Sequence, residues 1–305
     1  MNIKSGRYTI EVSNPDKNLF GKSDITKQEL LEYYQDIAPL MLRYCDNHPA
    51  TMQRFPNGID EKSFFQKEVG SYFPEWITRI AVKHSEGTVH YAVIDKPATI
   101  IYLANQACIA PHIWLSRADK INKPDRLIFD LDPSGKKFSF TDVQEAAKEL
   151  KKILDACKLP SFYMLTGSRG AHIIVPLKRI HTFDETREFA HDVALLLAHQ
   201  FPNMITTEMS KKKRGKRIFM DWLRNGFGAT AVAPYAVRAH EGAPVATPVT
   251  WKELMSKGMD SQKYTIKNIG KRIKKVGDLW NGMEKEAVSL KHARKILDKI
   301  IQENE

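Results

Sequence analysis

The chain has 305 residues, of which 42% are hydrophobic and 27% are charged, a composition typical of a globular protein. Its formal net charge of +11 favours a polyanionic partner over a charge excess that only keeps the protein soluble. Nucleic acid is favoured over a membrane as that partner. No apolar run approaches the roughly 18 residues that span a bilayer, and the amino terminus lacks the apolar core of a signal peptide. We therefore expect a cytoplasmic, nucleoid-associated protein with no membrane partner.

The three cysteines, Cys45, Cys108 and Cys157, are widely spaced and each lies among apolar residues. This pattern predicts buried thiols in a reducing compartment and excludes a cysteine-based zinc site. The positive charge is clustered, because six of the seven residues at 211–217 are cationic. Residues 271–275 hold a second group of four cations. Clustering of this kind is typical of a nucleic-acid-binding surface.

The first third of the chain begins with an expected short strand at 8–12 and a turn at 14–17. A helix over 28–45 follows, because its apolar residues recur at helical spacing and Thr26 forms a capping box with Glu29. Short strands with a hairpin turn at 85–87 are expected over 77–103.

Two adjacent aromatic residues, Phe64 and Phe65, stand beside Lys67. In a strand, one of the two rings must face away from the core and could stack on a nucleic-acid base. The alternative is that both rings are buried between a sheet and a helix. Further along, a helix or turn carrying His112 is expected over 104–115.

Asp130 lies within an apolar run at 127–131, and Asp132 follows directly after that run. The Pro-Ser-Gly sequence that comes next ends the predicted strand. We predict a buried strand in which the two side chains share one face, with Cα atoms about 6 to 7 Å apart. Such a pair repels itself unless cations neutralise it, and its hard oxygen ligands suit Mg²⁺ or Mn²⁺. A surface pair that caps a turn is the alternative.

Two further segments carry polar groups suited to chemistry. Between two apolar strands, a loop holds Thr166, Ser168 and Arg169, with His172 just beyond it, which favours a phosphate site over a plain glycine-rich hairpin. Asp221 lies in the apolar run 218–223 and is the natural partner of the first two carboxylates, because two shared metal ions need about three of them.

Arg238 also lies in an apolar run, where its guanidinium would be costly to bury without an anion. Helices are predicted over 140–157, capped by Thr141 with Gln144, and over 185–201. A helix capped by Thr250 is expected near residue 251, and a terminal helix over 284–302. No repeat or long linker interrupts the chain, so we expect one domain over 1–305. Its approximate subdomains would be a DNA-end-binding part at 1–110, a catalytic core at 111–282 and a carboxy-terminal helix at 283–305.

Three blocks in this order carry a resemblance: 129–133, 166–172, and Asp221 followed by 233–238. They resemble the signature blocks of the polymerase domain of bacterial ligase D, which belongs to the archaeo-eukaryotic primase superfamily, from about residue 10 to the end. The resemblance implies an α+β primase-polymerase fold with a β-rich catalytic core flanked by helices. Nothing resembles the Lys-x-Asp-Gly motif of a ligase, which implies a stand-alone polymerase that works with a separate DNA ligase.

The resemblance also implies roles for individual residues. The catalytic and metal-binding residues would be Asp130, Asp132 and Asp221, which would hold two Mn²⁺ or Mg²⁺ ions. The nucleotide-binding residues would be His112, Thr166, Ser168, Arg169, His172, Arg214 and Arg238. Members of the family often have Ser at the Thr166 position and Lys at the Arg169 position. The planar guanidinium of arginine contacts a phosphate with a different geometry from the ammonium of lysine. The DNA-binding residues would be Asn14, Lys17 and Lys27, at a 5′-phosphate, and Phe64 and Phe65, on template bases.

The function implied is a template-dependent nucleotidyltransferase that fills short gaps and extends primers at DNA breaks in non-homologous end joining. The resemblance further implies a preference for ribonucleotides and for Mn²⁺. Its partners would be DNA with a 5′-phosphorylated gap or end, NTP or dNTP, a separate DNA ligase and a Ku-like protein. The alternatives are a replicative primase that starts chains de novo and a non-catalytic DNA-end bridging module, which the retained carboxylates disfavour. A metal-dependent nuclease is also disfavoured, because its chemistry needs no triphosphate pocket.

Overall fold

The computed structural model describes residues 1–85, 87–135 and 138–304, and these form the expected α+β fold. They divide into two compact units, each assembled from three stretches of the chain. The first unit comprises Met1–Asp119, Thr230–Thr247 and Tyr264–Asp278, and the second comprises Lys120–Ala229, Pro248–Lys263 and Leu279–Glu305. These bounds differ from the expected subdomains at 1–110, 111–282 and 283–305. The expectation that 1–305 acts as a single domain stays a prediction.

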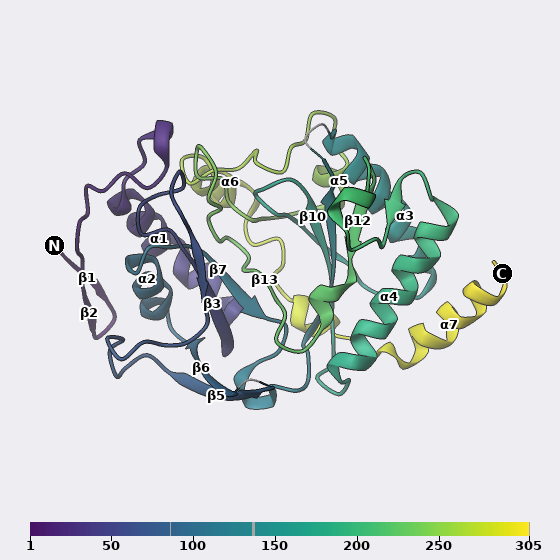
Figure 1. The fold of residues 1–305 in the computed structure, drawn as a ribbon, viewed down its shortest axis with the longest axis horizontal. Coiled ribbons are helices and arrows are strands. Elements are labelled where there is room, and N and C mark those ends of the chain that lie inside the picture. Colours follow the sequence, from purple (N-terminus) through teal and green to yellow (C-terminus); the bar gives the residue numbers. More distant parts are fainter. Residues whose placement is uncertain (86, 136–137, 305) are drawn as a thin grey trace. The chain divides into compact units, whose positions relative to one another are not determined.

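The first unit is built on an antiparallel sheet with the strand order β13-β7-β3-β6-β5, to which β4 adds by pairing with β3. Helices α1 and α2 pack against each other beside this sheet (Figure 1). The elements are β1 (Asn2–Ser5), β2 (Tyr8–Glu11), η1 (Gly21–Ser23), α1 (Lys27–Cys45), β3 (His48–Arg54), β4 (Phe64–Gln66), β5 (Arg79–His84), β6 (Gly87–Ile94), α2 (Pro97–Asn105), β7 (Cys108–Trp114), η2 (Ala118–Lys120), β13 (Thr230–Val232) and α6 (Ile269–Val276).

The start of α1 is as predicted, because Thr26 and Glu29 form a reciprocal capping box. Two expectations for this unit are wrong. His112 lies on strand β7 instead of in a helix or turn, and α2 lies within the range where only strands were expected. Every residue of β7 is buried, so its sequence lacks the periodicity that separates a strand from a helix. The expected turn at 85–87 includes residue 86, which lies outside the described residues; β5 and β6 on either side are antiparallel.

The second unit is built on a six-stranded sheet with the order β11-β12-β8-β10-β9-β14. Strand β8 occupies an inner position, and seven of its eight residues are buried, with Asp132 as the partly exposed one. The elements are β8 (Arg126–Pro133), α3 (Phe140–Ala156), β9 (Phe162–Leu165), β10 (Ala171–Pro176), α4 (Phe183–Gln200), β11 (Ile205–Thr206), η3 (Lys211–Lys213), β12 (Ile218–Asp221), η4 (Trp222–Asn225), β14 (Thr247–Val249), α5 (Trp251–Leu254), η5 (Met283–Glu286) and α7 (Leu290–Gln302).

Most helices of this unit match their predicted positions, but their caps differ in part. The cap of α3 is Ser139 with Asp142, two residues earlier than the expected Thr141, which lies inside the helix. The terminal helix α7 begins at Leu290, and the expected earlier residues form the separate turn η5. Thr250 caps α5 as predicted.

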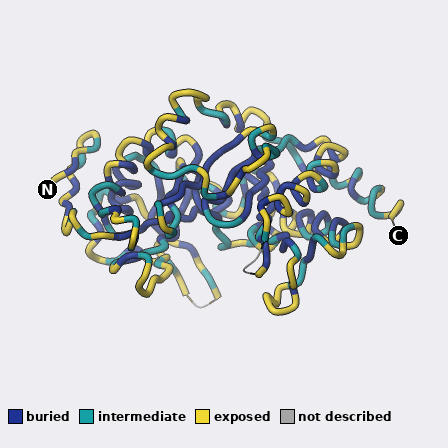
Figure 2. Tube along the Cα trace, turned by 90° about the horizontal axis from the view of Figure 1, so that it is seen from above, coloured by how far each residue is buried: buried dark blue, intermediate teal, exposed yellow. Residues whose placement is uncertain are grey.

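Buried residues follow the sheet strands and the inner helix faces of each unit, and exposed residues follow the loops (Figure 2). Cys45, Cys108 and Cys157 are all buried and reduced, as the sequence predicted. Burial raises the pKa of the Cys108 thiol to about 12 and that of Cys157 to about 11. Across the part of the chain that the structure describes, every helix is too short or too polar to cross a bilayer.

Candidate active site

The predicted carboxylates lie together on neighbouring strands of the second unit. Asp130 and Asp132 project from β8, and Asp221 ends β12, directly opposite Asp130 in the antiparallel register. Asp130 is only 8% exposed, so the pair belongs to a buried strand and the alternative of a surface turn is wrong. On the other side of β8, His172 of β10 lies opposite Asp130, with its Nε2 atom 3.5 Å from Oδ1.

Three arginines surround these carboxylates. Arg169 donates from Nη2 to Asp132 Oδ1 at 2.8 Å, and Arg214 Nη1 lies 3.7 Å from Oδ2 of the same residue. Arg224 places Nε 3.2 Å from Asp130 Oδ2 and 3.1 Å from Asp221 Oδ2, so that one guanidinium bridges two strands. The sequence analysis missed Arg224. The signal was its position three residues after Asp221, where the turn η4 folds it back over the carboxylate.

The three carboxyl groups differ in their electrostatics. Burial alone would raise the pKa of Asp130, but His172 and Arg224 outweigh it and hold the pKa well below its ordinary value. For Asp132, burial and the neighbouring Asp130 raise the pKa despite Arg169 and Arg214. Burial also raises the pKa of Asp221, which Arg224 only partly offsets. Burial therefore outweighs the arginines at Asp132 and Asp221 but not at Asp130.

The loop between β9 and β10 is braced from within. The buried Thr166 hydroxyl donates to the Gly170 carbonyl at 3.0 Å, and Ser261 donates to the same carbonyl at 2.7 Å. A Cβ on Gly170 would lie 1.9 Å from the Leu131 carbonyl oxygen, so only glycine allows the loop to pack on β8. Gln262 holds the loop from outside by donating to the Ser168 carbonyl at 2.9 Å. Sequence reasoning missed both braces, which are distant in the chain.

Two of the expected nucleotide-binding residues are fixed beside the carboxylates. Arg214 donates to the carbonyls of Glu208 and Met209, and its guanidinium stacks 3.5 Å from the ring centre of Phe219. The His172 side chain is buried, and its Nδ1 atom finds no hydrogen-bond partner within the described residues. A buried polar atom left in this state is suited to a ligand that can hydrogen-bond to it.

The fit of the trio to a divalent metal rests on its donors. Among the described residues, no three His, Cys, Asp or Glu side chains are arranged to hold a metal ion, and the arginines pair with the carboxylate oxygens of the trio. The donors themselves are suitable, because Asp130, Asp132 and Asp221 offer hard oxygens from adjacent strands. The residues therefore fit Mg²⁺ or Mn²⁺ once the arginines yield.

The predicted aromatic residues lie in the first unit. Phe64 is 46% exposed and Phe65 is 56% exposed, so the alternative in which both rings are buried is wrong. The Phe65 ring meets the His112 ring edge-on, with 5.5 Å between centroids, and Arg54 lies over the Phe64 ring. Successive side chains of a strand face opposite ways, so the two exposed rings lie on opposite faces of β4, Phe65 beside the buried His112 and Phe64 beside the Arg54 cation.

The residues expected at a 5′-phosphate also lie in the first unit. Lys27 is only 5% exposed and donates from Nζ to the Ser13 carbonyl at 2.7 Å. Burial, with the nearby charges of Lys17 and Arg54, lowers the pKa of Lys27. Lys17 donates to the Asn57 side chain at 2.9 Å, and Asn14, three residues earlier in the chain, adopts a left-handed backbone conformation. The positive charges of Lys17 and Arg54 thus add to burial in disfavouring the Lys27 ammonium, and a bound anion would offset this.

Arg238 and His112 belong to the first unit, whereas the carboxylate trio belongs to the second. The structure brings Asp130, Asp132, Asp221, Thr166, Ser168, Arg169, His172 and Arg214 into one unit. The basic segment 211–217 leads directly into β12 within that same unit, with Lys211, Lys212 and Lys213 exposed.

Comparison with known proteins bears on this arrangement. Residues 26–280 match the family described as "LigD, primase-polymerase domain". The chain belongs to the LigD primase-polymerase domain family. A relative of known structure, the polymerase domain of ligase D from Mycobacterium tuberculosis in complex with DNA, shares 30% sequence identity and a TM-score of 0.84. That likeness covers 91% of this chain and 99% of the other, and it confirms the predicted primase-polymerase fold.

Curated relatives of the LigD domain are longer proteins. The multifunctional non-homologous end joining protein LigD of Mycolicibacterium smegmatis is 30% identical over 280 residues, which make up 91% of this chain and 36% of that protein. The bifunctional non-homologous end joining protein LigD of Bacillus subtilis is 30% identical over 269 residues, or 88% of this chain and 43% of that protein. The chain thus spans less than half the length of these relatives.

Proposed function

We propose that this LigD-type domain is a template-dependent nucleotidyltransferase that fills short gaps and extends primers at DNA breaks during end joining. The observation that carries the proposal is the trio Asp130, Asp132 and Asp221 on adjacent strands, surrounded by cations and a braced, glycine-containing loop. Kinship supports it, because the relatives are named for non-homologous end joining and one solved relative is a polymerase domain bound to DNA.

The trio would hold two Mn²⁺ or Mg²⁺ ions, which when bound supply the charge that activates the primer 3′-hydroxyl and neutralises the triphosphate and the leaving pyrophosphate. Arg169 and Arg214, released from Asp132 as the charge there is balanced, would each donate to phosphate oxygens. The buried Nδ1 of His172 would hydrogen-bond to the incoming nucleotide. Because Arg214 is already stacked and hydrogen-bonded, it needs little reorganisation to do so.

The first unit would bind the DNA. Phe64 and Phe65, exposed on β4, would stack on template bases, and His112 would lie near the incoming nucleotide. Lys17 and Lys27, with Asn14, would bind the 5′-phosphate on the far side of a gap. Thr166 and Ser168 would shape the triphosphate loop, and Arg238 would complete the set of phosphate contacts. A separate DNA ligase and a Ku-like protein are the partners we propose.

The activity is tested by a panel of substrates. The purified chain should add nucleotides to a primer across a short, 5′-phosphorylated gap, in the order that the template dictates. It should add ribonucleotides faster than deoxyribonucleotides and work better with Mn²⁺ than with Mg²⁺. Synthesis on an unprimed single strand would instead identify a primase. DNA binding without any addition, under all metal and nucleotide combinations, would leave only an end-bridging module.

A further inference from the structure

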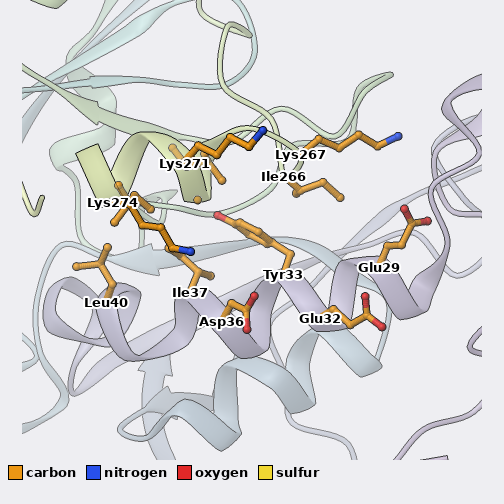
Figure 3. Close-up of a pocket in the computed structure, with 13 residues that line it drawn as sticks. Glu29, Glu32, Tyr33, Asp36, Ile37, Leu40, Ile266, Lys267, Lys271 and Lys274 are labelled. Carbon is orange, nitrogen blue, oxygen red and sulfur yellow. The ribbon is translucent and has the colours of Figure 1, made fainter. Parts of the chain in front are cut away.

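A groove of about 670 Å³ lies in the first unit between helix α1 and the segment 266–274, which includes α6 (Figure 3). Its lining includes apolar side chains, among them Ile37 and Leu40 of α1 with Ile266 and Ile273 opposite. Tyr33 is held in place because its hydroxyl donates to the Tyr235 carbonyl at 2.7 Å. None of these residues belongs to the proposed catalytic or DNA-binding set.

One wall of the groove is acidic. Glu29, Glu32 and Asp36 line it from α1, at spacings of three and four residues that place them along one helix face. They extend over about two turns, or about 10 Å at the rise of an α-helix. Glu29 also caps the helix, but Glu32 and Asp36 are exposed. Like charges at these spacings repel one another in the free protein.

The opposite wall is basic. Lys267, Lys271 and Lys274 line it at spacings of four and three residues, and all three are exposed (Figure 3). Within the described ranges, no ion pair joins these lysines to the acids of α1 across the groove. Each wall therefore carries three charges of one sign, and the fold itself does not neutralise them.

Gly270 is the second residue of α6, in the first turn of that helix, and also lines the groove. Its backbone is not left-handed, so its conformation does not require glycine. A Cβ built at this position would meet nothing within 4 Å, so the fold has no steric need for glycine. Glycine at this position would, however, let an external molecule approach the α6 backbone closely.

From these observations we propose that the groove is a docking site for an amphipathic α-helix of a protein partner. The partner helix would place an apolar ridge on Ile37 and Ile273 and approach the backbone at Gly270. Its basic flank would face the acids of α1 and its acidic flank would face the lysines of α6. The acids of α1 recur at helical spacing over two turns, and Lys271 and Lys274 do so on α6, which matches the repeat of a helix lying along the groove.

A nucleic acid fits this groove less well, because its phosphates would be repelled by Glu32 and Asp36 on the α1 wall. A partner with charges of only one sign would likewise be repelled by one of the two walls. A helix with mixed flanks is attracted by both walls, and charge complementarity of this kind gives specificity and register.

The test uses three fluorescein-labelled, hydrocarbon-stapled peptides with one leucine ridge and either mixed, all-lysine or all-glutamate flanks. Their binding to the full chain is measured by fluorescence anisotropy. The mixed peptide should bind at least about tenfold tighter than either uniform peptide. Lys271→Glu with Lys274→Glu makes both walls acidic and should shift the preference to the all-lysine peptide. Lys295→Glu with Lys299→Glu, an equal charge change on α7, is the matched control and should leave the preference unchanged.

Gly270 provides the second arm. Gly270→Leu should weaken the mixed peptide at least about tenfold, whereas Gly270→Ala should not lower the thermal unfolding midpoint, because its Cβ meets nothing within 4 Å. Equal binding of the three peptides, binding of none, or destabilisation by Gly270→Ala would overturn the proposal. It would also fall if the Lys271 and Lys274 changes reduced only DNA affinity, or if sedimentation showed that they dissociate a dimer of this chain.

Discussion

Asp130 and Asp221 lie directly opposite each other on β8 and β12, and the Nε atom of Arg224 is within 3.2 Å of the first carboxylate and 3.1 Å of the second. The antiparallel register thus forces two acids together where both are largely removed from solvent, and one arginine provides their shared counter-charge. A divalent ion that binds these oxygens must displace that guanidinium, so Arg224 and the metal compete for the same atoms.

Arg224→Ala should therefore lower stability without metal and tighten metal binding. Removing one partner of a buried ion pair costs about 3 to 5 kcal/mol, but Arg224 is 39% exposed, and solvent screening should reduce the loss to about 1 to 2 kcal/mol. The affinity for Mn²⁺, read as free Mn²⁺ by electron paramagnetic resonance, should rise about tenfold, or 1.4 kcal/mol. Denaturant unfolding without and with Mn²⁺ measures the stability.

The matched control for this change is Arg187→Ala, which removes an exposed ion pair to Asp184 on α4 in the same unit. It should change stability by less than about 0.5 kcal/mol and leave Mn²⁺ affinity unaltered. Unchanged Mn²⁺ affinity in Arg224→Ala would show that the arginine does not occupy the metal-binding oxygens.

Lys17→Ala should weaken binding to a gap that carries a 5′-phosphate by about 1 to 3 kcal/mol, the scale of a charge-assisted hydrogen bond. Lys17 is the better target than Lys27, because the buried Lys27 ammonium also holds the Ser13 carbonyl and its removal would disturb the fold. Fluorescence anisotropy with phosphorylated and unphosphorylated gaps measures the effect, and the unphosphorylated gap should bind nearly as it does to the parent.

Lys83→Ala, which removes an exposed lysine from β5 in the same unit, controls for a general loss of positive charge. Lys83→Ala should weaken binding to both gaps only slightly. If Lys17→Ala weakens binding to both gaps equally, Lys17 contributes only nonspecific attraction. The assignment of a 5′-phosphate site to Lys17, Lys27 and Asn14 would then be wrong.

The hydrogen bond between His181 and the first residue of α7 makes the stability of the protein depend on pH. Its Nε2 accepts a hydrogen bond from the Leu290 amide at 2.9 Å, so the ring must be neutral at that atom. Burial lowers the pKa of His181, with Lys291 and Lys123 acting in the same direction and Glu185 opposing them. Because the folded pKa lies below the unfolded value, this contribution to stability is complete above the unfolded pKa of about 6.5 and is lost as the pH falls through the folded pKa.

The free energy of unfolding should therefore fall more steeply from neutral to mildly acidic pH in the parent than in His181→Gln, whose amide oxygen accepts the Leu290 N–H at every pH. His181→Ala should cost about 1 to 3 kcal/mol at neutral pH, since it leaves that buried donor unpaired. Urea titrations at several pH values measure both effects. Parallel pH profiles for the parent and His181→Gln would refute the role of His181.

The sequence predicted the elements that carry the carboxylates, because an apolar run that contains Asp130 and is followed by Asp132 is a local pattern with period two. It also predicted the cap of α1 and the loop after β9. It could not reveal Arg224, whose importance depends on the register between β8 and β12, or Ser261, which braces a loop some ninety residues away. Such pairings are set by tertiary packing and leave no local pattern.

The misassigned stretches have a common physical cause. Residues 97–114 are apolar almost throughout, so neither a helical nor a strand period stands out, and α2 and β7 were not separated. The exposure of both Phe64 and Phe65 follows from the short strand β4, which pairs with β3 and lies off the main path of the sheet. A strand in that position can expose side chains on both faces.

Template-directed nucleotide addition across a short gap, compared between the parent and Asp130→Asn, tests most directly whether the carboxylate trio carries nucleotidyl transfer. Asparagine keeps the volume at the centre of β8 but removes one of the charges that would bind metal. Addition should fall below detection, while gapped-DNA affinity by anisotropy and the circular dichroism spectrum should change little. Undiminished, template-directed addition by Asp130→Asn would contradict the assignment of the catalytic site to this trio.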